Sequence, residues 1–192
     1  MERFKASLRT EWFKYLIVAV LSVVVWVFAF GMYHAPQAYE KISVFFAGNV
    51  KDYSFEKVAA DAFEELRKVE LSSADPNANT FAHKYELVAF NGSDIVILPE
   101  SVAAGTLCNG SFVVQEPCGE MFTQTEKDIN GGDVEVAYGV YLPEEALAAL
   151  GKYFTFGNER YVVLIPGSSL NAGTLTRHAF DFEKWLVGYV QA

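Results

Sequence analysis

Polar side chains follow three of the strands that this sequence predicts, and their types suit hydrogen bonding to a ligand. They end the apolar runs at 42–49 and 94–101 and fill the loop 166–174. In open α/β sheets, ligands bind outside the carboxyl ends of the strands. If the three places converge on one cleft, the candidate ligand-binding residues are Asn49, Glu100, Ser101, Ser168, Ser169 and Asn171. The alternative is structural: Asn49 makes a turn, Ser101 caps a helix and the loop is simply polar.

Known catalytic and metal-binding motifs are missing from the sequence. The histidines His34, His83 and His178 form no HExxH motif, and the cysteines form no CxxC pair. The loop GSSLNAG at 167–173 lacks the glycine that a nucleophile elbow places two residues after its serine, and it lacks the lysine of a phosphate loop. DINGGD at 128–133 has too few acids for an EF-hand and predicts a turn. We therefore expect a non-catalytic protein without a cofactor or a metal site.

Two cysteines, Cys108 and Cys118, lie ten residues apart in CNGSFVVQEPC. Outside the cytoplasm such a pair forms a disulfide when the fold brings the thiols together. Two free, buried thiols are the other interpretation of the same spacing, and the sequence leaves both open.

The elements that position these residues follow an apolar segment at 15–33, which contains 19 residues and no charge. As a helix it spans about 28 Å, close to the thickness of a hydrocarbon core. Trp12, Tyr15 and Tyr33 stand at its edges, where aromatic side chains prefer the membrane interface. The segment therefore predicts a transmembrane helix that anchors the chain in the lipid bilayer. A cleaved signal peptide and a buried core helix are the alternatives.

Charge is distributed unevenly along the chain. Residues 1–33 carry four basic side chains against two acidic ones, a net charge of +2, so the total of −9 leaves −11 for the remainder. All four basic residues precede the apolar segment, and the positive-inside rule then places 1–14 in the cytoplasm and the body outside, at the cell membrane. An acidic body excludes nucleic acid as a partner, because phosphate binding needs a basic patch.

The body consists of a linker at 34–41 and one domain at 42–192. Its apolar, β-branched runs predict strands at 42–49, 84–90, 94–101 and 111–117, and hairpins around NGGD and around Gly157 and Asn158 within 152–165. Helical spacing and helix-start signals predict helices at 54–70, 143–150 and 179–190, with a turn-rich loop at 72–80. Four aliphatic residues without alternation in DIVILPES indicate a strand buried on both faces. We expect an α/β fold with one mixed, partly parallel sheet flanked by helices.

Several segments resemble extracytoplasmic solute-binding proteins. They are DIVILPES followed by VAAGTLCNGSFVVQEP, then YGVYLP, then YVVLIPGSSLNAG with FEKWLVGYV. The resemblance covers 42–190 and implies a reduced periplasmic-binding-protein-like fold, of the kind found in small single-pass membrane proteins of Gram-positive bacteria. Complete members close two lobes around a ligand, whereas 34–192 is long enough for one lobe and part of another.

Anchor, charge and resemblance together suggest a membrane-anchored extracytoplasmic module that binds a solute or a partner protein. A structural or assembly subunit of a membrane complex, with the apolar helix as the interaction surface, is the second hypothesis. The segment contains no GxxxG motif that favours helix pairing. An enzyme of unknown class is the third.

Overall fold

The computed structural model describes residues 2–106, 112–115, 118–129 and 131–189, of which 2–11 and 106 are described as backbone only. By its internal contacts the chain divides into two units, Met1–Pro36 and Gln37–Ala192. Each unit is described by itself below.

The first unit is one helix, α1, Glu2–His34. Its part Trp12–His34 has a mean hydropathy of 2.5 and is long and apolar enough to cross a membrane. Within its own unit, none of that part is buried. The hydroxyl of Ser22 donates to the carbonyl of Val18 at 2.8 Å, so the serine within the apolar stretch is satisfied without a water molecule.

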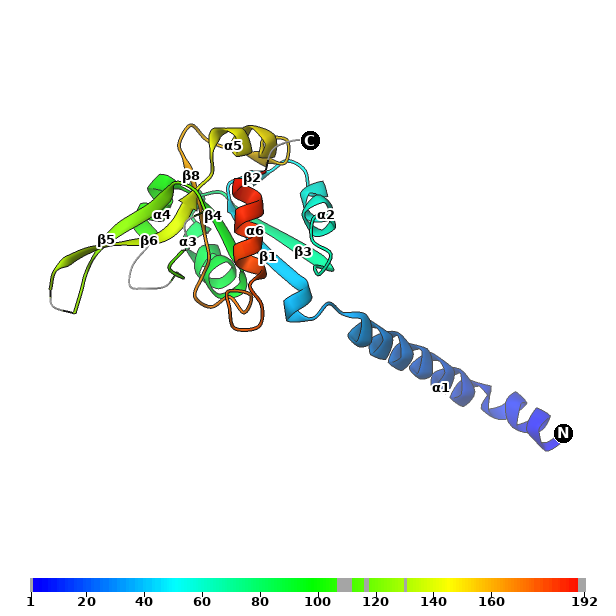
Figure 1. The fold of residues 1–192 in the computed structure, drawn as a ribbon. Helices are drawn as coiled ribbons and strands as arrows, with labels where there is room; N and C mark the ends of the chain where they lie inside the picture. The colour runs from blue at the N-terminus through cyan, green and yellow to red at the C-terminus, as the bar shows by residue number, and fades with distance from the viewer. Residues whose placement is uncertain (1, 107–111, 116–117, 130, 190–192) are drawn as a thin grey trace. The chain divides into compact units, whose positions relative to one another are not determined.

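The second unit is built on a six-stranded sheet in the order β3-β1-β4-β8-β6-β5 (Figure 1). Its strands are β1 Lys41–Ala47, β3 Lys68–Ala74, β4 Ile95–Pro99, β5 Met121–Lys127, β6 Asp133–Tyr141 and β8 Tyr161–Leu164. β3, β1 and β4 run parallel, and β8, β6 and β5 continue the sheet with antiparallel pairing. A separate pair joins β2 Asn49–Val50 to β7 Phe154–Thr155. The predicted α/β fold with a mixed, partly parallel sheet is confirmed.

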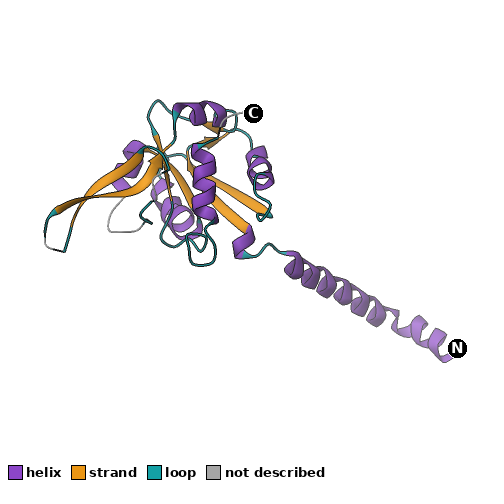
Figure 2. Ribbon diagram, viewed as in Figure 1, coloured by secondary structure: helices purple, strands orange, loops and turns teal. Residues whose placement is uncertain are grey.

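Helices cover both faces of the sheet (Figure 2). α2 Ser54–Asp61, α5 Glu144–Leu150 and α6 His178–Val187 pack on one face, and α3 Phe81–Lys84, the π-helical turn η2 Tyr85–Phe90 and α4 Glu100–Thr106 pack on the other. A short 3-10 turn, η1 Ala38–Glu40, precedes β1. The alternation of β1 feeds both cores: Val44 and Phe46 belong to one, Phe45 and Ala47 to the other.

The predicted helix at 54–70 and the loop at 72–80 are partly wrong. α2 ends at Asp61, and Lys68–Ala74 is the strand β3, paired in parallel with β1. Val69 and Leu71 are buried at alternate positions of this strand. Val69 also continued the helical spacing of the preceding residues, so the pattern did not distinguish the last helical turn from the start of a strand.

The predicted strand at 84–90 is helical. Phe81, Tyr85 and Ala89 are spaced by four residues and pack together against the β1–β4 face of the second core. α3 and η2 thereby form the second crossover, which carries the chain from β3 to β4 on the face opposite α2. Two crossovers of this kind explain why three strands are parallel.

The hairpin predicted within 152–165 is also wrong. β7 pairs with β2, whereas β8 lies between β4 and β6. All four residues of β8 are buried, and such a strand is stable only where it has neighbours on both edges and cover on both faces. Of the predicted strand at 111–117, the described part contributes a single bridge from Phe112 to Pro166.

The hairpin around NGGD and the helix near 143–150 are confirmed as β5–β6 and α5. The predicted closing helix is α6, which starts at His178 and ends at Val187. Gly131 has φ +83° beside the hairpin turn, a conformation that glycine adopts without strain.

Candidate functional site

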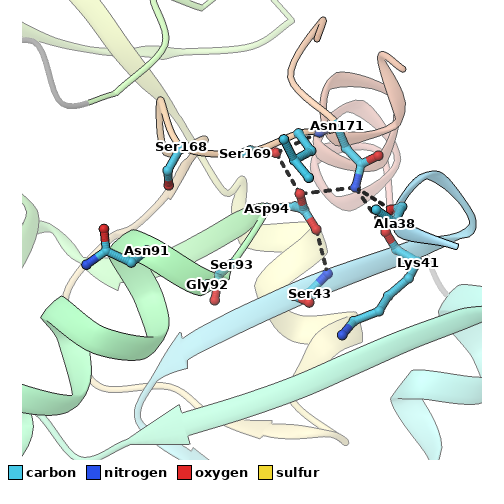
Figure 3. A pocket seen from close by; sticks show the side chains of 11 residues that line it. Ala38, Lys41, Ser43, Asn91, Gly92, Ser93, Asp94, Ser168, Ser169 and Asn171 are labelled. Carbon is cyan, nitrogen blue, oxygen red and sulfur yellow. Dashed lines mark hydrogen bonds between the residues drawn. The ribbon is translucent and has the colours of Figure 1, made fainter. Parts of the chain in front are cut away.

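A cluster of polar side chains joins the amino ends of β1 and β4 to the loop after β8. It consists of Ser43, Asp94, Ser169 and Asn171, and we call it the Asp94 cluster (Figure 3). The Asp94 carboxylate accepts from the Ser43 amide at 2.9 Å, from the Ser169 hydroxyl at 2.6 Å and from the Asn171 amide group at 3.1 Å. Asn171 also donates to the carbonyls of Ala38 and Lys41. The cluster therefore fastens the start of β1 to a loop distant in sequence.

Around this cluster lies an open hollow of about 200 Å³. Three further polar side chains that line it donate hydrogen bonds to carbonyl oxygens: Ser93 to Val88, Ser168 to Phe90 and Asn91 to Glu86. A ligand in this hollow would have to replace internal hydrogen bonds rather than satisfy open ones. The arrangement favours a structural role for these residues.

A second cluster, the Arg160 cluster, lies at the carboxyl end of β4 and contains Glu100, Glu120, Tyr141 and Arg160. The Arg160 guanidinium donates to both oxygens of Glu100 at 3.2 and 3.1 Å and to Glu120 at 2.5 Å. Its Cζ atom lies 3.6 Å from the centre of the Tyr141 ring. The Tyr141 hydroxyl donates to Glu100 at 2.6 Å. One cation is thus held between two carboxylates and an aromatic face.

The pKa values of the Glu100 carboxyl group and the Tyr141 hydroxyl group in this cluster are shifted in opposite directions. Hydrogen bonds from Arg160, and then from Tyr141, lower the pKa of Glu100. Burial, reinforced by the bond to Glu100, raises the pKa of Tyr141 to about 12. At neutral pH the carboxylate and the guanidinium are therefore charged and the phenol is neutral. Beside them a hollow of about 450 Å³ has an apolar wall that includes Leu142, Leu147 and Val187.

The six predicted ligand-binding residues do not converge on one cleft. Glu100 and Ser101 open α4 at the carboxyl end of β4, whereas Ser168, Ser169 and Asn171 lie near its amino end. The reason is the direction of β8: Tyr161 pairs with Pro99 and Leu164 with Val96, so the loop after β8 lies at the amino end of β4. Asn49 does not end β1, which stops at Ala47, but begins β2 opposite Thr155.

Ser101 is not the cap of α4 that the sequence suggested. The helix already begins at Glu100, and the Ser101 amide donates to the carboxylate of Glu159 at 3.0 Å. Glu159 therefore supplies the acceptor for an amide of the first turn, a favourable place for a negative charge.

The residues at the centre of each cluster, Asp94 and Arg160, were not among the predicted site residues. Asp94 is the first letter of DIVILPES, and an acid directly before a strand buried on both faces is a signal for a paired or hydrogen-bonded carboxylate. Arg160 had no comparable signal, because its partners come from three other segments of the chain.

A buried carboxyl group lies on α6. Glu183 is 1% exposed and its Oε1 atom has no hydrogen-bond partner among the described residues. Burial raises its pKa to about 8, with the neighbouring Lys184 opposing the shift. Burial and then Glu183 raise the pKa of Cys118 to about 11, so this thiol stays protonated at neutral pH and is a poor nucleophile. Cys108 lies outside the described residues, so the disulfide stays a prediction.

The β5–β6 arm, residues 121–141, is the longest projection of the sheet. Only Gly139, Val140 and Tyr141 of β6 pair with β8, so the rest of the hairpin extends beyond it (Figure 1). Ile129 near its tip is 100% exposed, and Val134 is 45% exposed. Among the residues that the structure describes, no group of three or more His, Cys, Asp or Glu side chains is placed to hold a metal ion.

Comparisons with models of protein families, with curated proteins and with solved structures found no match for this chain.

Proposed function

We propose that this chain is a membrane-anchored, non-catalytic module that binds a partner protein outside the cytoplasm. The support for the anchor is the length and hydropathy of Trp12–His34, and the support for the orientation is the basic stretch that precedes it. The fold adds an α/β domain whose resemblance to reduced solute-binding proteins rests on sequence segments alone.

The observation that carries the proposal is the contrast between the β5–β6 arm and the two hollows. Polar side chains within the Asp94 cluster and within the Arg160 cluster are hydrogen-bonded to one another. The arm instead exposes two large apolar side chains on a projecting hairpin, Ile129 at 100% and Val134 at 45%. An apolar tip on a projecting hairpin gains stability when a partner covers it.

The test is photo-crosslinking in membranes of the cells that naturally contain this protein. A photoreactive amino acid replaces Ile129 in one variant and Leu175 in the other, because Leu175 is also an exposed apolar residue of a connecting segment. We expect one defined adduct from position 129 and none of that mass from position 175. The same adducts from both positions, or none from position 129, would contradict the proposal.

A small solute is the second candidate ligand, favoured by the hollow beside the Arg160 cluster. Its volume of about 450 Å³ lies within the range of small-molecule sites, and it lies at the carboxyl end of β4. Thermal unfolding of the full chain in detergent, against sugars, amino acids, peptides and anions, tests it. A ligand at 100 times its dissociation constant adds about 2.7 kcal/mol to the free energy of unfolding. The shift must disappear in Arg160→Gln for this hollow to be the site.

A further inference from the structure

We infer that the outer edge of β5 pairs with an extended, basic segment of a partner protein; the inference rests on the proposed function and specifies the chemistry of its partner. Among the residues that the structure describes, β5 is the last strand of the sheet on its side. The backbone groups of a terminal strand that point away from its neighbour are a template for one further strand.

The hydrogen bonds at the tip of the arm determine which groups point outward. The Asp128 amide donates to the Gly132 carbonyl at 2.8 Å, and β5 pairs from there with Lys127 opposite Asp133 and Thr125 opposite Glu135. Bonded and non-bonded pairs alternate in an antiparallel ladder. Thr125 and Lys127 therefore direct their amide and carbonyl groups away from β6, towards the open edge.

The opposite edge of the sheet, formed by β3, is partly protected against pairing with another chain. At that edge the amide of Leu71 in β3 donates to the side chain of Glu56 at 2.8 Å. Glu70 in the same strand forms ion pairs with Lys41 at 2.6 Å and with Lys68 at 2.7 Å. A capped amide and a row of charges are devices that keep a sheet edge from pairing with another chain.

Charge selects the kind of segment that fits the β5 edge. The β5–β6 arm carries four acids, Glu126, Asp128, Asp133 and Glu135, against the single base Lys127. Its net charge is therefore −3, on a body of net charge −11. A basic segment is attracted to this arm, and like charges directly across a strand pair are destabilising. Because a second copy of the chain brings the same acids, self-pairing of two β5 strands is disfavoured.

The side chains of β5 are compatible with an added strand. Thr123, Thr125 and Lys127 are exposed, and threonine is a favourable strand residue. Gln124 faces the other way and donates to the Ala104 carbonyl of α4 at 3.3 Å, which holds β5 to the domain. This bond connects the proposed docking edge to α4.

The test uses the full chain in a non-ionic detergent and two blocked hexapeptides as probes, one of alternating lysine and valine and one of alternating glutamate and valine. Thr125→Pro removes the outward amide at a position where the ladder to β6 does not need it. Thr125→Val keeps the amide and is the matched control. We expect the basic peptide to bind at least about tenfold more tightly than the acidic one, and Thr125→Pro to remove that binding while Thr125→Val retains it.

A second variant keeps the test independent of how the arm tolerates proline. The double substitution Asp133→Lys and Glu135→Lys reverses the sign of the net charge of the arm. We expect it to abolish the preference for the basic peptide without altering the circular dichroism spectrum.

Equal affinities of the wild type for both peptides, or unchanged binding to Thr125→Pro, would overturn the inference. Dimers in the ultracentrifuge that Thr125→Pro dissociates would overturn it in favour of self-pairing. If the photo-adduct at position 129 persists while the peptides fail, only this inference fails; loss of the adduct removes the proposed function itself.

Discussion

The carboxylate of Asp94 and the hydroxyl of Ser169 form a buried hydrogen bond of 2.6 Å across 75 residues of sequence. This bond connects the beginning of β4 to the loop between β8 and α6. The same Asp94 oxygen accepts from Asn171, and the second oxygen accepts from the Ser43 amide. Through these hydrogen bonds a single carboxylate connects three segments of the domain.

Replacement of Asp94 by alanine is expected to destabilise the domain. It leaves the Ser43 amide and the Ser169 hydroxyl without their acceptor in a site that is mostly buried, and we expect a loss of about 2–4 kcal/mol. Chemical denaturation followed by circular dichroism measures it. Asp61→Ala, at the exposed end of α2, is the control and should change the free energy of unfolding by less than about 0.5 kcal/mol. Equal effects of the two substitutions would contradict the structural role of Asp94.

Replacement of Arg160 is expected to lower the melting temperature in a pH-dependent manner. Because Arg160 lowers the pKa of Glu100, its contribution is present above the ordinary pKa of a glutamate and disappears as the pH falls through the lowered pKa of Glu100. Arg160→Gln should therefore differ most from the wild type near neutral pH. Arg160→Lys keeps the charge but loses the bidentate bond to Glu100. Its melting temperature should lie between those of the wild type and Arg160→Gln. A difference that stays constant with pH would contradict this assignment.

Glu183 is expected to make the protein less stable as the pH rises. Its pKa in the folded state is about 8, whereas an exposed glutamate ionises near 4.5. Below both pKa values Glu183 is protonated in the folded and in the unfolded protein. Between the two pKa values only the unfolded protein releases this proton, so the free energy of unfolding falls by up to about 1.4 kcal/mol per pH unit.

The variant Glu183→Gln should remove this slope and raise the melting temperature at pH 8. The matched control on the same helix is Asp181→Asn, which replaces an exposed carboxylate and should preserve the slope. Carboxyl groups with a lowered pKa, such as Glu70 and Glu100, titrate below this window and do not interfere. A slope that survives in Glu183→Gln would show that another group produces it.

Gly139→Ala is expected to disrupt the pairing of β6 with β8. A Cβ atom at this position of β6 would lie 2.6 Å from the Val163 carbonyl oxygen and 2.6 Å from Leu164, so β6 and β8 would have to separate. We expect a cost of about 1–3 kcal/mol in the free energy of unfolding. Gly105→Ala in α4 meets nothing within 4 Å and should stabilise the domain slightly, by less than about 1 kcal/mol. The pair of variants thus predicts opposite signs for the same chemical change.

Protease added to intact cells is expected to remove the body of the protein and leave a fragment that contains α1. The expectation follows from four basic residues before the apolar segment and none within it. An antibody against an amino-terminal tag detects the fragment, and permeabilised cells provide the control. Full protection of the body in intact cells would contradict the orientation, and a mature amino terminus after Ala38 would show that the segment is cleaved.

The sequence predicted local features of this fold well and their long-range arrangement poorly. β4 was recognisable because four consecutive aliphatic residues have no polar face. The helix at 81–90 was not, because KYELVAF fits alternation as well as helical spacing and only its packing on Phe45 distinguishes them. The predicted convergence of the candidate residues on one cleft is absent for a topological reason: nothing in the residues of β8 reveals that it runs antiparallel to β4, and that direction decides which loops meet.

The bonds from Asn171 to the carbonyls of Ala38 and Lys41 have a mechanical consequence. These carbonyls lie at the point where the chain that leads from α1 joins the domain. A force transmitted along that chain therefore acts first on Asn171 and then on β1, an interior strand held by β3 on one side and β4 on the other. To extract β1 by its amino end, the pull must break both registers, so the domain resists tension at its tether more strongly than it would if its first strand lay at an edge of the sheet.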